Sequence, residues 1–575
     1  MHLPFPGAPG AQYLGDHRCR FSVWAPAARR VEVHIAAPED RLIVLDRQPD
    51  GMFAADAAGV APGTRYFFRL DGKDDLPDPA SRHQPDGVFG PSAVIDTAFA
   101  WTAPRPGVPA AADLVIYELH VGTFSAAGTF DGAIPYLDAL ADLGVTAIEL
   151  CPIAEFPGAR NWGYDGVFAY AAQSTYGGPE GLFRLVDAAH ARGLAVLLDV
   201  VYNHVGPEGN VLARFGPYFT AGRTPWGEAI NFDGSGSDEV RAYFIESALY
   251  YMTELGIDGF RVDAIHAICD HAATPFVAAL AAAIHERAAA LGTRTMVIAE
   301  SDLNDPRVIA PADGFGFGMD AQWSDDFHHA LAAKLTGERA GYYADFGTLG
   351  DLARAFCDGF VLIGQRSRFR GRSHGRPAPA AGGERFVVFS QNHDQVGNRP
   401  RGDRLALSVT PAAQRVTACA LLIAPYIPLL FMGQEYGETA PFPYFTSHAD
   451  ATLGRAVKAG RASELSAFGW PEACAWDPQD PGAFAAAKLD PGRGDSTAGR
   501  GLRALYGELL RLRKAHLWTD AVDRFATRAV ADEARQTVTV YREGAGVRWV
   551  CVLAFGTGNT EVAIDFGPGP WRQIL

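Results

Sequence analysis

Eight short apolar segments, separated by polar loops and helix-like stretches, constrain the fold of this chain more than any other feature. Each is mostly apolar, as expected for parallel strands that are buried on both faces of a sheet. The segments are 114–120, 147–152, 195–201, 259–263, 296–300, 316–320, 386–390 and 427–432. Eight such units, with helices between them, predict an α/β fold of the (β/α)8 or TIM-barrel type, whose active site lies at the carboxyl ends of the strands.

Helical patterns lie between several of these segments. The clearest begins with Thr274 as N-cap and Pro275 as first helical residue, and it ends before Gly292. The stretch 202–240 is instead a long loop rich in glycine, proline and aromatic residues. A loop of this length in a compact domain is usually functional.

Short β-like runs flank the predicted barrel on both sides. Turn-forming residues separate the runs 19–25, 31–35 and 64–70, which predicts a small β-sandwich. The proline-rich stretch 76–85 cannot be a central strand. A helix at 502–514 precedes further β-like runs at 536–541, 547–553 and 561–565. We therefore expect an N-terminal β-sandwich domain at 1–100, a catalytic barrel with inserted loops at 101–495, and a C-terminal helix with a small β domain at 496–575.

Composition limits the partners and the compartment. The net charge of −16 argues against nucleic acid or an anionic membrane as a partner and suits a neutral substrate. No apolar run approaches the ~20 residues of a membrane span, and the start of the chain has no signal-peptide pattern. The cysteines at 19, 151, 269, 357, 419, 474 and 551 are dispersed. Such a set predicts reduced thiols in a cytoplasmic protein.

Carboxylates end three of the predicted strands. They are Asp263, Glu300 and Asp394. Side chains alternate along a strand, so Arg261 and Asp263 point the same way, and the guanidinium favours the ionised carboxylate. On this stretch alone a purely structural ion pair is an equally good interpretation, because ion pairs also perturb pKa values without doing chemistry.

Cleavage of a glycosidic bond needs such a set of acids. One carboxylate attacks or stabilises the anomeric carbon, and one protonated carboxyl donates to the leaving oxygen. Glu300 follows an apolar strand with no cation beside it in the sequence, which fits an acid of raised pKa. Asp263 fits the nucleophile, and Asp394, next to His393, fits a carboxylate that grips sugar hydroxyls.

Four segments together resemble the characteristic regions of the α-amylase family of glycoside hydrolases, in the same order. They are 199–204 (Asp-Val-Val-Tyr-Asn-His), 259–263, 298–300 and 391–394 (Gln-Asn-His-Asp). The resemblance implies retention of configuration through a covalent glycosyl–Asp263 intermediate, with Glu300 as acid and then base. The N-terminal sandwich likewise resembles that of isoamylases and branching enzymes.

The resemblance further implies which residues contact the sugar. Arg261, His204 and His393 would hold it at the cleavage position. Tyr164 would stack on its apolar face, although a core aromatic role remains the alternative for this residue. The expected substrate-binding set is completed by Trp162, Asp165 and His266.

More specific segments resemble those family members that release trehalose from the end of maltooligosyltrehalose. These are 205–210, 224–233, 300–307 and 431–445. The resemblance implies cleavage of the α-1,4 bond next to the terminal trehalose unit, and a synthase acting upstream to make the substrate. We expect trehalose to be recognised by the loop after Glu300 and by 323–327. We expect a monomer without cofactor, and without metal because the 202–240 loop lacks acids in the spacing of a calcium cage.

Two other functions stay open. A glycogen branching or debranching enzyme would share the sandwich and the three acids, and a non-catalytic α-glucan-binding protein would use the same folds as a platform. The second would lack one of the acids, and none is missing here. The family usually has another strand or two after the point that this sequence reaches at Trp571 to Leu575. We therefore expect either a clipped chain or an incomplete last sheet.

Overall fold

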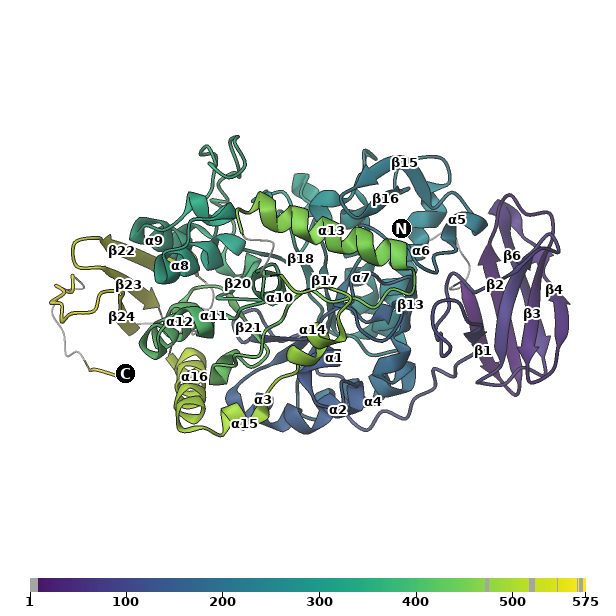
Figure 1. Cartoon of the computed structure of the whole chain (residues 1–575), viewed down its shortest axis with the longest axis horizontal. Coiled ribbons are helices and arrows are strands. Elements are labelled where there is room, and N and C mark those ends of the chain that lie inside the picture. The colour runs from purple at the N-terminus through teal and green to yellow at the C-terminus, as the bar shows by residue number, and fades with distance from the viewer. Residues whose placement is uncertain are drawn as a thin grey trace.

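The computed structural model describes residues 9–470, 475–516, 523–544, 547–565, 567 and 572–574. Cys474, Trp571 and Leu575 lie outside the described residues. An N-terminal pair of sheets, a central barrel with its helices and a C-terminal sheet follow one another along the long axis of the molecule (Figure 1). Among the helices described, none combines the length and apolar composition needed to cross a bilayer.

Eight parallel strands close into the predicted barrel, and every residue in them is buried. This burial on both faces explains why the strands are apolar runs. In closing order they are β10 (Ile116–Leu119), β11 (Ala147–Leu150), β14 (Ala195–Val200), β17 (Gly259–Val262), β18 (Val297–Ala299), β19 (Ala321–Trp323), β20 (Phe386–Phe389) and β21 (Ile427–Phe431). Seven of them lie within the predicted segments.

The prediction of the sixth strand was wrong. The segment 316–320 is apolar but folds back on its own loop: the backbone N–H of Gly316 donates to Pro311 O, and Gly318 has a φ of +70°. The strand follows immediately as β19. Its central residue is Gln322, so its apolar signal was too weak to be recognised.

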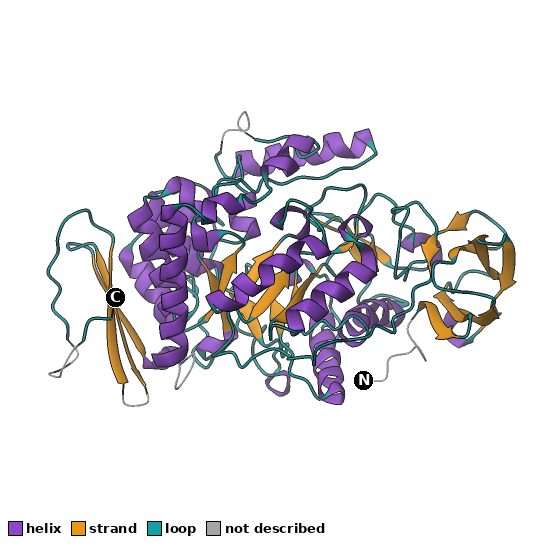
Figure 2. Cartoon of the chain, turned by 90° about the horizontal axis from the view of Figure 1, so that it is seen from below, coloured by secondary structure: helices purple, strands orange, loops and turns teal. Residues whose placement is uncertain are grey.

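Helices surround the barrel strands (Figure 2). The main ones are α3 (Leu137–Leu143), α4 (Gly178–His190), α6 (Ser237–Thr253), α7 (Phe276–Leu291), α8 (Asp325–Thr336), α9 (Leu349–Asp358) and α12 (Pro411–Ile423). Helix α7 ends at Gly292 in a left-handed conformation, as predicted. Its start differs by one residue, because Pro275 has an extended ψ of 144° and is the N-cap.

Two antiparallel sheets form the predicted N-terminal sandwich. One contains β1 (Gly10–Gly15), β2 (Arg18–Trp24), β6 (Met52–Ala58) and β5 (Asp46–Arg47); the other contains β4 (Arg41–Val44), β3 (Val31–Ala37), β7 (Arg65–Leu70), β8 (Asp75–Leu76) and β9 (Ser92–Ala93). Trp24 meets Tyr218 edge to face at 5.5 Å. The hydroxyl of Tyr243 on α6 donates to Pro79 O, in the proline-rich stretch, at 2.7 Å. These contacts dock the sandwich against the barrel.

The C-terminal part begins with α16 (Thr497–His516) and continues into one antiparallel sheet of β22 (Thr527–Asp532), β23 (Thr537–Gly544) and β24 (Val547–Ala554). The runs 536–541 and 547–553 were predicted correctly. The run 561–565 was not: it forms no strand, whereas β22 was missed. Strand β22 alternates only weakly and is half-exposed, so its sequence has little strand pattern.

The long loop after β14 is an ordered excursion over the barrel. It carries α5 (Leu212–Phe215) and a hairpin of β15 (Phe219–Thr224) and β16 (Gly227–Ile230). Trp226, at the tip of this hairpin, stacks on His204 with ring centroids 5.6 Å apart. Another excursion, after β21, contains α13 (Ala451–Ala467), which crosses the front of the barrel in Figure 1.

Candidate active site

The three predicted acids follow the carboxyl ends of barrel strands, two of them on neighbouring strands. Val262 and Ala299 are register partners in β17 and β18, and Asp263 and Glu300 are the next residue of each strand. Neighbouring strands lie roughly 4.8 Å apart, which suits the separation of about 5 Å between the carboxyl groups of retaining glycosidases. Asp394 lies in the short helix α10 (His393–Gly397), which follows β20.

Both oxygens of Asp263 are held by buried side chains. Arg261 Nη1 donates to Oδ1 at 2.6 Å, as the alternation along β17 predicted. Asn203 Nδ2 donates to Oδ2 at 2.7 Å. Arg261 is itself fully buried, with its guanidinium carbon 4.2 Å from the ring centroid of Trp323. These charge-assisted hydrogen bonds fix the carboxylate in one orientation.

Glu300 has the environment of a proton donor. Burial raises the pKa of its carboxyl well above the usual value, and the negative charges of Asp263 and Asp394 raise it further. No cation is next to Glu300 in the sequence, but one is near it in space: Arg261 Nη2 is 3.8 Å from Oε2 and lowers the pKa of Glu300. Burial outweighs this effect. Arg261 reaches Glu300 from the neighbouring strand, which sequence adjacency cannot reveal.

A chain of hydrogen bonds joins His393 to the nucleophile position. The hydroxyl of Tyr164 lies 2.7 Å from His393 Nε2 and donates to Asp199 Oδ2, also at 2.7 Å. Asp199 in turn accepts from Arg261 Nη1 at 2.8 Å. The ring of Tyr164 stacks on His393 with centroids 5.1 Å apart. His393, Tyr164 and Arg261 therefore form one network behind the acids.

The other predicted sugar-binding residues lie at different depths. His204 is buried, and its ring nitrogens contact Asn203 Oδ1 at 2.5 Å and Tyr164 O at 2.8 Å. Trp162 is also buried and stacks on Phe442, so it lies behind His393 and supports it.

The last two predicted residues, Asp165 and His266, each have polar partners of their own. Asp165 accepts from Asn161 Nδ2 at 2.5 Å. His266 is partly exposed, 4.0 Å from Asp302 in the loop after Glu300. Arg370 donates to the same aspartate at 3.2 Å, so a positive side chain joins this loop.

The segment 323–327 contributes less to a substrate surface than the sequence suggested. Trp323 lies under Arg261, and Phe327 is fully buried against Phe356. Asp325 accepts from Gln395 Nε2 at 3.3 Å, and burial and the negative charge of Asp394 raise its pKa to about 7. Phe327 itself, being buried, offers no surface to trehalose.

Three contributors were missed or underrated by the sequence interpretation. Asn203 and Asp199 lie in a segment that was recognised, but their contacts depend on the path of the loop after β14. Glu118 was overlooked, although a single acid inside the apolar segment 114–120 was a visible signal. It is buried on β10 and bonds to His393 Nδ1 at 2.5 Å.

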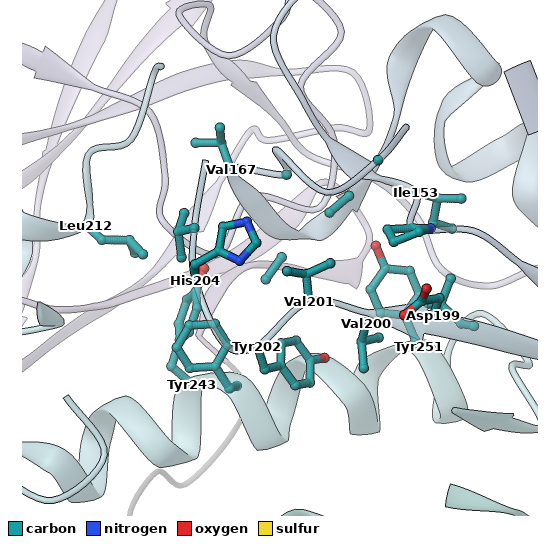
Figure 3. Close-up of a pocket in the computed structure, with 18 residues that line it drawn as sticks. Ile153, Val167, Asp199, Val200, Val201, Tyr202, His204, Leu212, Tyr243 and Tyr251 are labelled. Carbon is teal, nitrogen blue, oxygen red and sulfur yellow. The ribbon is translucent and has the colours of Figure 1, made fainter. Parts of the chain in front are cut away.

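A cavity of about 30 Å³ lies next to this network (Figure 3). Its lining includes Asp199, His204 and Tyr202, but none of the three acids. A volume of this size suits roughly one water molecule and not a sugar ring. The cavity therefore belongs to the packing behind the site.

Two family models match the sequence. The α-amylase catalytic domain matches residues 89–216, and carbohydrate-binding module 48, the isoamylase N-terminal domain, matches residues 9–85. The malto-oligosyltrehalose trehalohydrolase of Saccharolobus solfataricus is 45% identical over 88% of this chain and 86% of its own. That of Arthrobacter ramosus is 44% identical over 96% and 93%. A 1,4-alpha-glucan branching enzyme of Corynebacterium jeikeium is a weaker match, 26% identical over 98% and 76%.

Solved structures show the same architecture. A putative alpha amylase from Salmonella typhimurium superposes with a TM-score of 0.86 and 38% sequence identity, covering 96% of this chain and 94% of that one. A pullulanase from Paenibacillus barengoltzii gives a TM-score of 0.72 at 21% identity, over 98% and 91% of the two chains. The second likeness concerns the fold alone.

Proposed function

The chain belongs to the α-amylase family and, within it, to the malto-oligosyltrehalose trehalohydrolases, and we propose that Asp263, Glu300 and Asp394 carry out its reaction. It is a glycoside hydrolase that cleaves the α-1,4 bond next to the terminal trehalose unit of maltooligosyltrehalose. The products are trehalose and a maltooligosaccharide. One observation supports these roles most directly. Asp263 is a carboxylate held by hydrogen bonds, Glu300 is a buried carboxyl, and the two follow adjacent strands.

Asp263 is the nucleophile. Its hydrogen bonds to Arg261 and Asn203 hold the carboxylate in one orientation, toward the anomeric carbon. Attack from one face expels the trehalose oxygen from the other, which forms a covalent glycosyl–Asp263 ester. Water then attacks the same carbon, so the configuration is retained after two displacements.

Glu300 is the general acid and then the general base. Its Oε2 already accepts a hydrogen bond from the backbone N–H of Ala264 at 2.6 Å, which leaves Oε1 to carry the transferable proton. The raised pKa keeps that proton on the carboxyl near neutral pH. After it protonates the leaving trehalose, the resulting carboxylate accepts a proton from the attacking water.

Asp394 and its neighbours hold the sugar. Asp394 is the most exposed of the three acids, with 38% of its side chain accessible. It hydrogen-bonds hydroxyls of the sugar ring at the cleavage position. Tyr164 offers a ring face to the pyranose. Arg261 orients Asp263, and His393 Nε2 lies 3.6 Å from Asp394 Oδ2, while His204 and Trp162 keep Tyr164 and His393 in place.

Recognition of the trehalose end falls to the loop after Glu300. Asp302 and its partner Arg370 lie there with His266 and supply polar groups for sugar hydroxyls. Asp165 and the 202–240 loop, with Trp226 stacked on His204, contribute further polar and aromatic groups. The N-terminal sandwich, which matches a carbohydrate-binding module, is proposed as a separate domain of residues 1–100.

The cellular context follows from the reaction. The substrate requires a synthase that converts the end of a maltooligosaccharide into a trehalose unit, and we propose that such an enzyme acts upstream. The free thiols of the six described cysteines are consistent with the proposed cytoplasmic location. We also propose that the chain acts as a monomer.

The assignment is tested by product analysis. The protein is incubated separately with maltotriosyltrehalose and with maltopentaose, and the sugars are separated by chromatography. We expect rapid release of trehalose and maltotriose from the first and little attack on the second. Equal cleavage of both would retain the hydrolase activity but reject the trehalose specificity.

A further inference from the structure

A buried carboxylate on the first barrel strand faces the histidine of the catalytic network. Glu118 lies within β10 and is 1% exposed. Its Oε1 is 2.5 Å from His393 Nδ1, and its Oε2 accepts from the backbone N–H of His393 at 3.0 Å. One side chain thus fixes both the ring and the peptide of the residue that precedes Asp394.

The hydrogen-bond donors along the network can be assigned in order. The hydroxyl of Tyr164 has one proton and donates it to the Asp199 carboxylate, so it must accept from His393 Nε2. Nδ1 of the same ring faces the Glu118 carboxylate and donates to it. Both ring nitrogens therefore carry protons, and His393 is an imidazolium.

Other charged groups around His393 agree with this protonation state. Burial alone lowers the pKa of His393, but the charges of Asp394 and Glu118 outweigh it and raise the pKa to about 9. Arg261 opposes them. The remaining titratable groups that face the ring from the surrounding elements are Glu149 and Cys151 from β11, Tyr164, Asp199 from β14 and His120 after β10. Glu149 is buried beside other acids, which raises its pKa well above the usual value and keeps it neutral.

The ligand atoms of Glu118, Cys151 and His393 lie within 4.8 Å of one another, a spacing that also fits a metal site. The hydrogen bond between Glu118 Oε1 and His393 Nδ1 already uses the facing atoms of two of the three groups. Among the described residues, this cluster is therefore better explained as a hydrogen-bonded pair with a cysteine beside it.

We propose that Glu118 is a positioning residue for the hydrolysis: it holds His393 as an imidazolium, aims its Nε2–H toward Tyr164 and the sugar, and sets the backbone from which Asp394 projects. The inference rests on the proposed function and adds to it a residue that does not touch the substrate. A carboxylate that accepts from one ring nitrogen in this way fixes the direction of the ring and stabilises its protonated form. Glu118 thereby supports two groups of the cleavage position at once.

Glu118→Gln tests the proposal because it removes the charge with little change of volume. We expect kcat on maltotriosyltrehalose to fall about 10- to 100-fold with little change in KM. Loss of the negative charge of Glu118 lowers the pKa of His393. The decrease in activity at alkaline pH should therefore begin at a lower pH in the variant than in the wild type. The matched control is Glu155→Gln, at a buried glutamate whose carboxylate is bonded to Ser174, which should keep the wild-type kcat and pH profile.

A double-mutant cycle separates this role from general damage. If Glu118 acts through His393, adding Glu118→Gln to His393→Gln causes no further loss of kcat and no further shift of the pH profile. Additive losses, or a Glu118→Gln enzyme with the wild-type kcat and pH profile, would overturn the proposal. Should Glu118→Gln not fold, Glu118→Asp replaces it in the same cycle, with a smaller loss of kcat and the same non-additivity expected.

The wild-type protein is assayed on maltotriosyltrehalose and maltopentaose beside the variants. No hydrolysis by the wild type would contradict the proposed function itself. Hydrolysis by the wild type with an unimpaired Glu118→Gln variant would contradict only the positioning role of Glu118.

Discussion

The backbone N–H of Ala264 donates to Oε2 of Glu300 at 2.6 Å, so the residue after the nucleophile holds the acid. Ala264 adopts a left-handed conformation, with φ 41° and ψ 48°. For a residue other than glycine this conformation costs about 1–3 kcal/mol. The turn directs the N–H of Ala264 away from the β17 ladder and toward Glu300. Local strain is thus located where the two carboxyl groups must be held at a fixed separation.

Asp263→Asn should abolish most of the activity without unfolding the protein. An amide is a poor nucleophile, so kcat on maltotriosyltrehalose should fall at least about 1,000-fold. The control is Asp56→Asn, at an exposed position of β6, which should retain full activity. Steady-state kinetics and the thermal unfolding midpoint check both variants. Near-normal turnover by Asp263→Asn would reject its role as nucleophile.

The raised pKa of Glu300 predicts the alkaline limb of the pH profile. The acid acts only when protonated, so kcat/KM should decrease as the pH rises through this pKa. Asp325→Asn removes one of the negative charges that raise it, so the same decrease should occur at lower pH. Initial rates over a pH series measure the shift. An unchanged profile for Asp325→Asn would mean that its charge does not reach Glu300.

Most barrel strands could be predicted because burial on both faces requires apolar side chains at consecutive positions. Strand β19 escaped because a glutamine occupies its centre, while the apolar segment before it turns back at two glycines. In the C-terminal sheet, half-exposed residues of β22 gave no alternating pattern. Sequence patterns thus located elements whose environment is uniform and missed those whose environment varies from residue to residue.

The acids could be predicted because they directly follow apolar strands, whereas their partners could not. Whether Arg261 reaches Glu300, or Glu118 reaches His393, depends on strand register and on which side chains meet across the barrel. Neither distance follows from separation along the chain, which is 275 residues for Glu118 and His393. The positions of reacting groups were therefore accessible from the sequence, but the network that tunes them was not.

Asp394→Asn should lower kcat more than it raises KM. Asp394 hydrogen-bonds the sugar more strongly as the ring distorts toward the transition state. It therefore stabilises the transition state more than the bound substrate. We expect kcat to fall roughly 100-fold with KM changed only a few-fold. The loss of charge also lowers the pKa of His393, which Asp394 helps to raise. A pure increase in KM would show instead that Asp394 only binds the substrate.

Asp258→Ala should destabilise the barrel without acting on the chemistry. The carboxylate of Asp258 is inaccessible and accepts from Arg105 Nε at 2.8 Å, His190 Nε2 at 2.9 Å and Val196 N at 2.8 Å. It thereby holds Arg105, in the segment that leads into the barrel, against the first residues of β14 and β17. Removing one partner of a buried ion pair costs about 3–5 kcal/mol, because the groups left behind lose their charge partner without gaining water.

The matched control for Asp258→Ala is Asp138→Ala. Asp138 forms an ion pair with Arg192 at 2.6 Å, but its side chain is 69% exposed, so water replaces the lost contact. Urea or thermal unfolding should show a clear loss of stability for Asp258→Ala and no measurable change for Asp138→Ala. Because Asp258 lies at the start of β17 and Asp263 follows its end, kcat of the folded Asp258→Ala protein should stay near the wild-type value. Equal stability of the two variants would mean that the buried pair contributes no more than an exposed one.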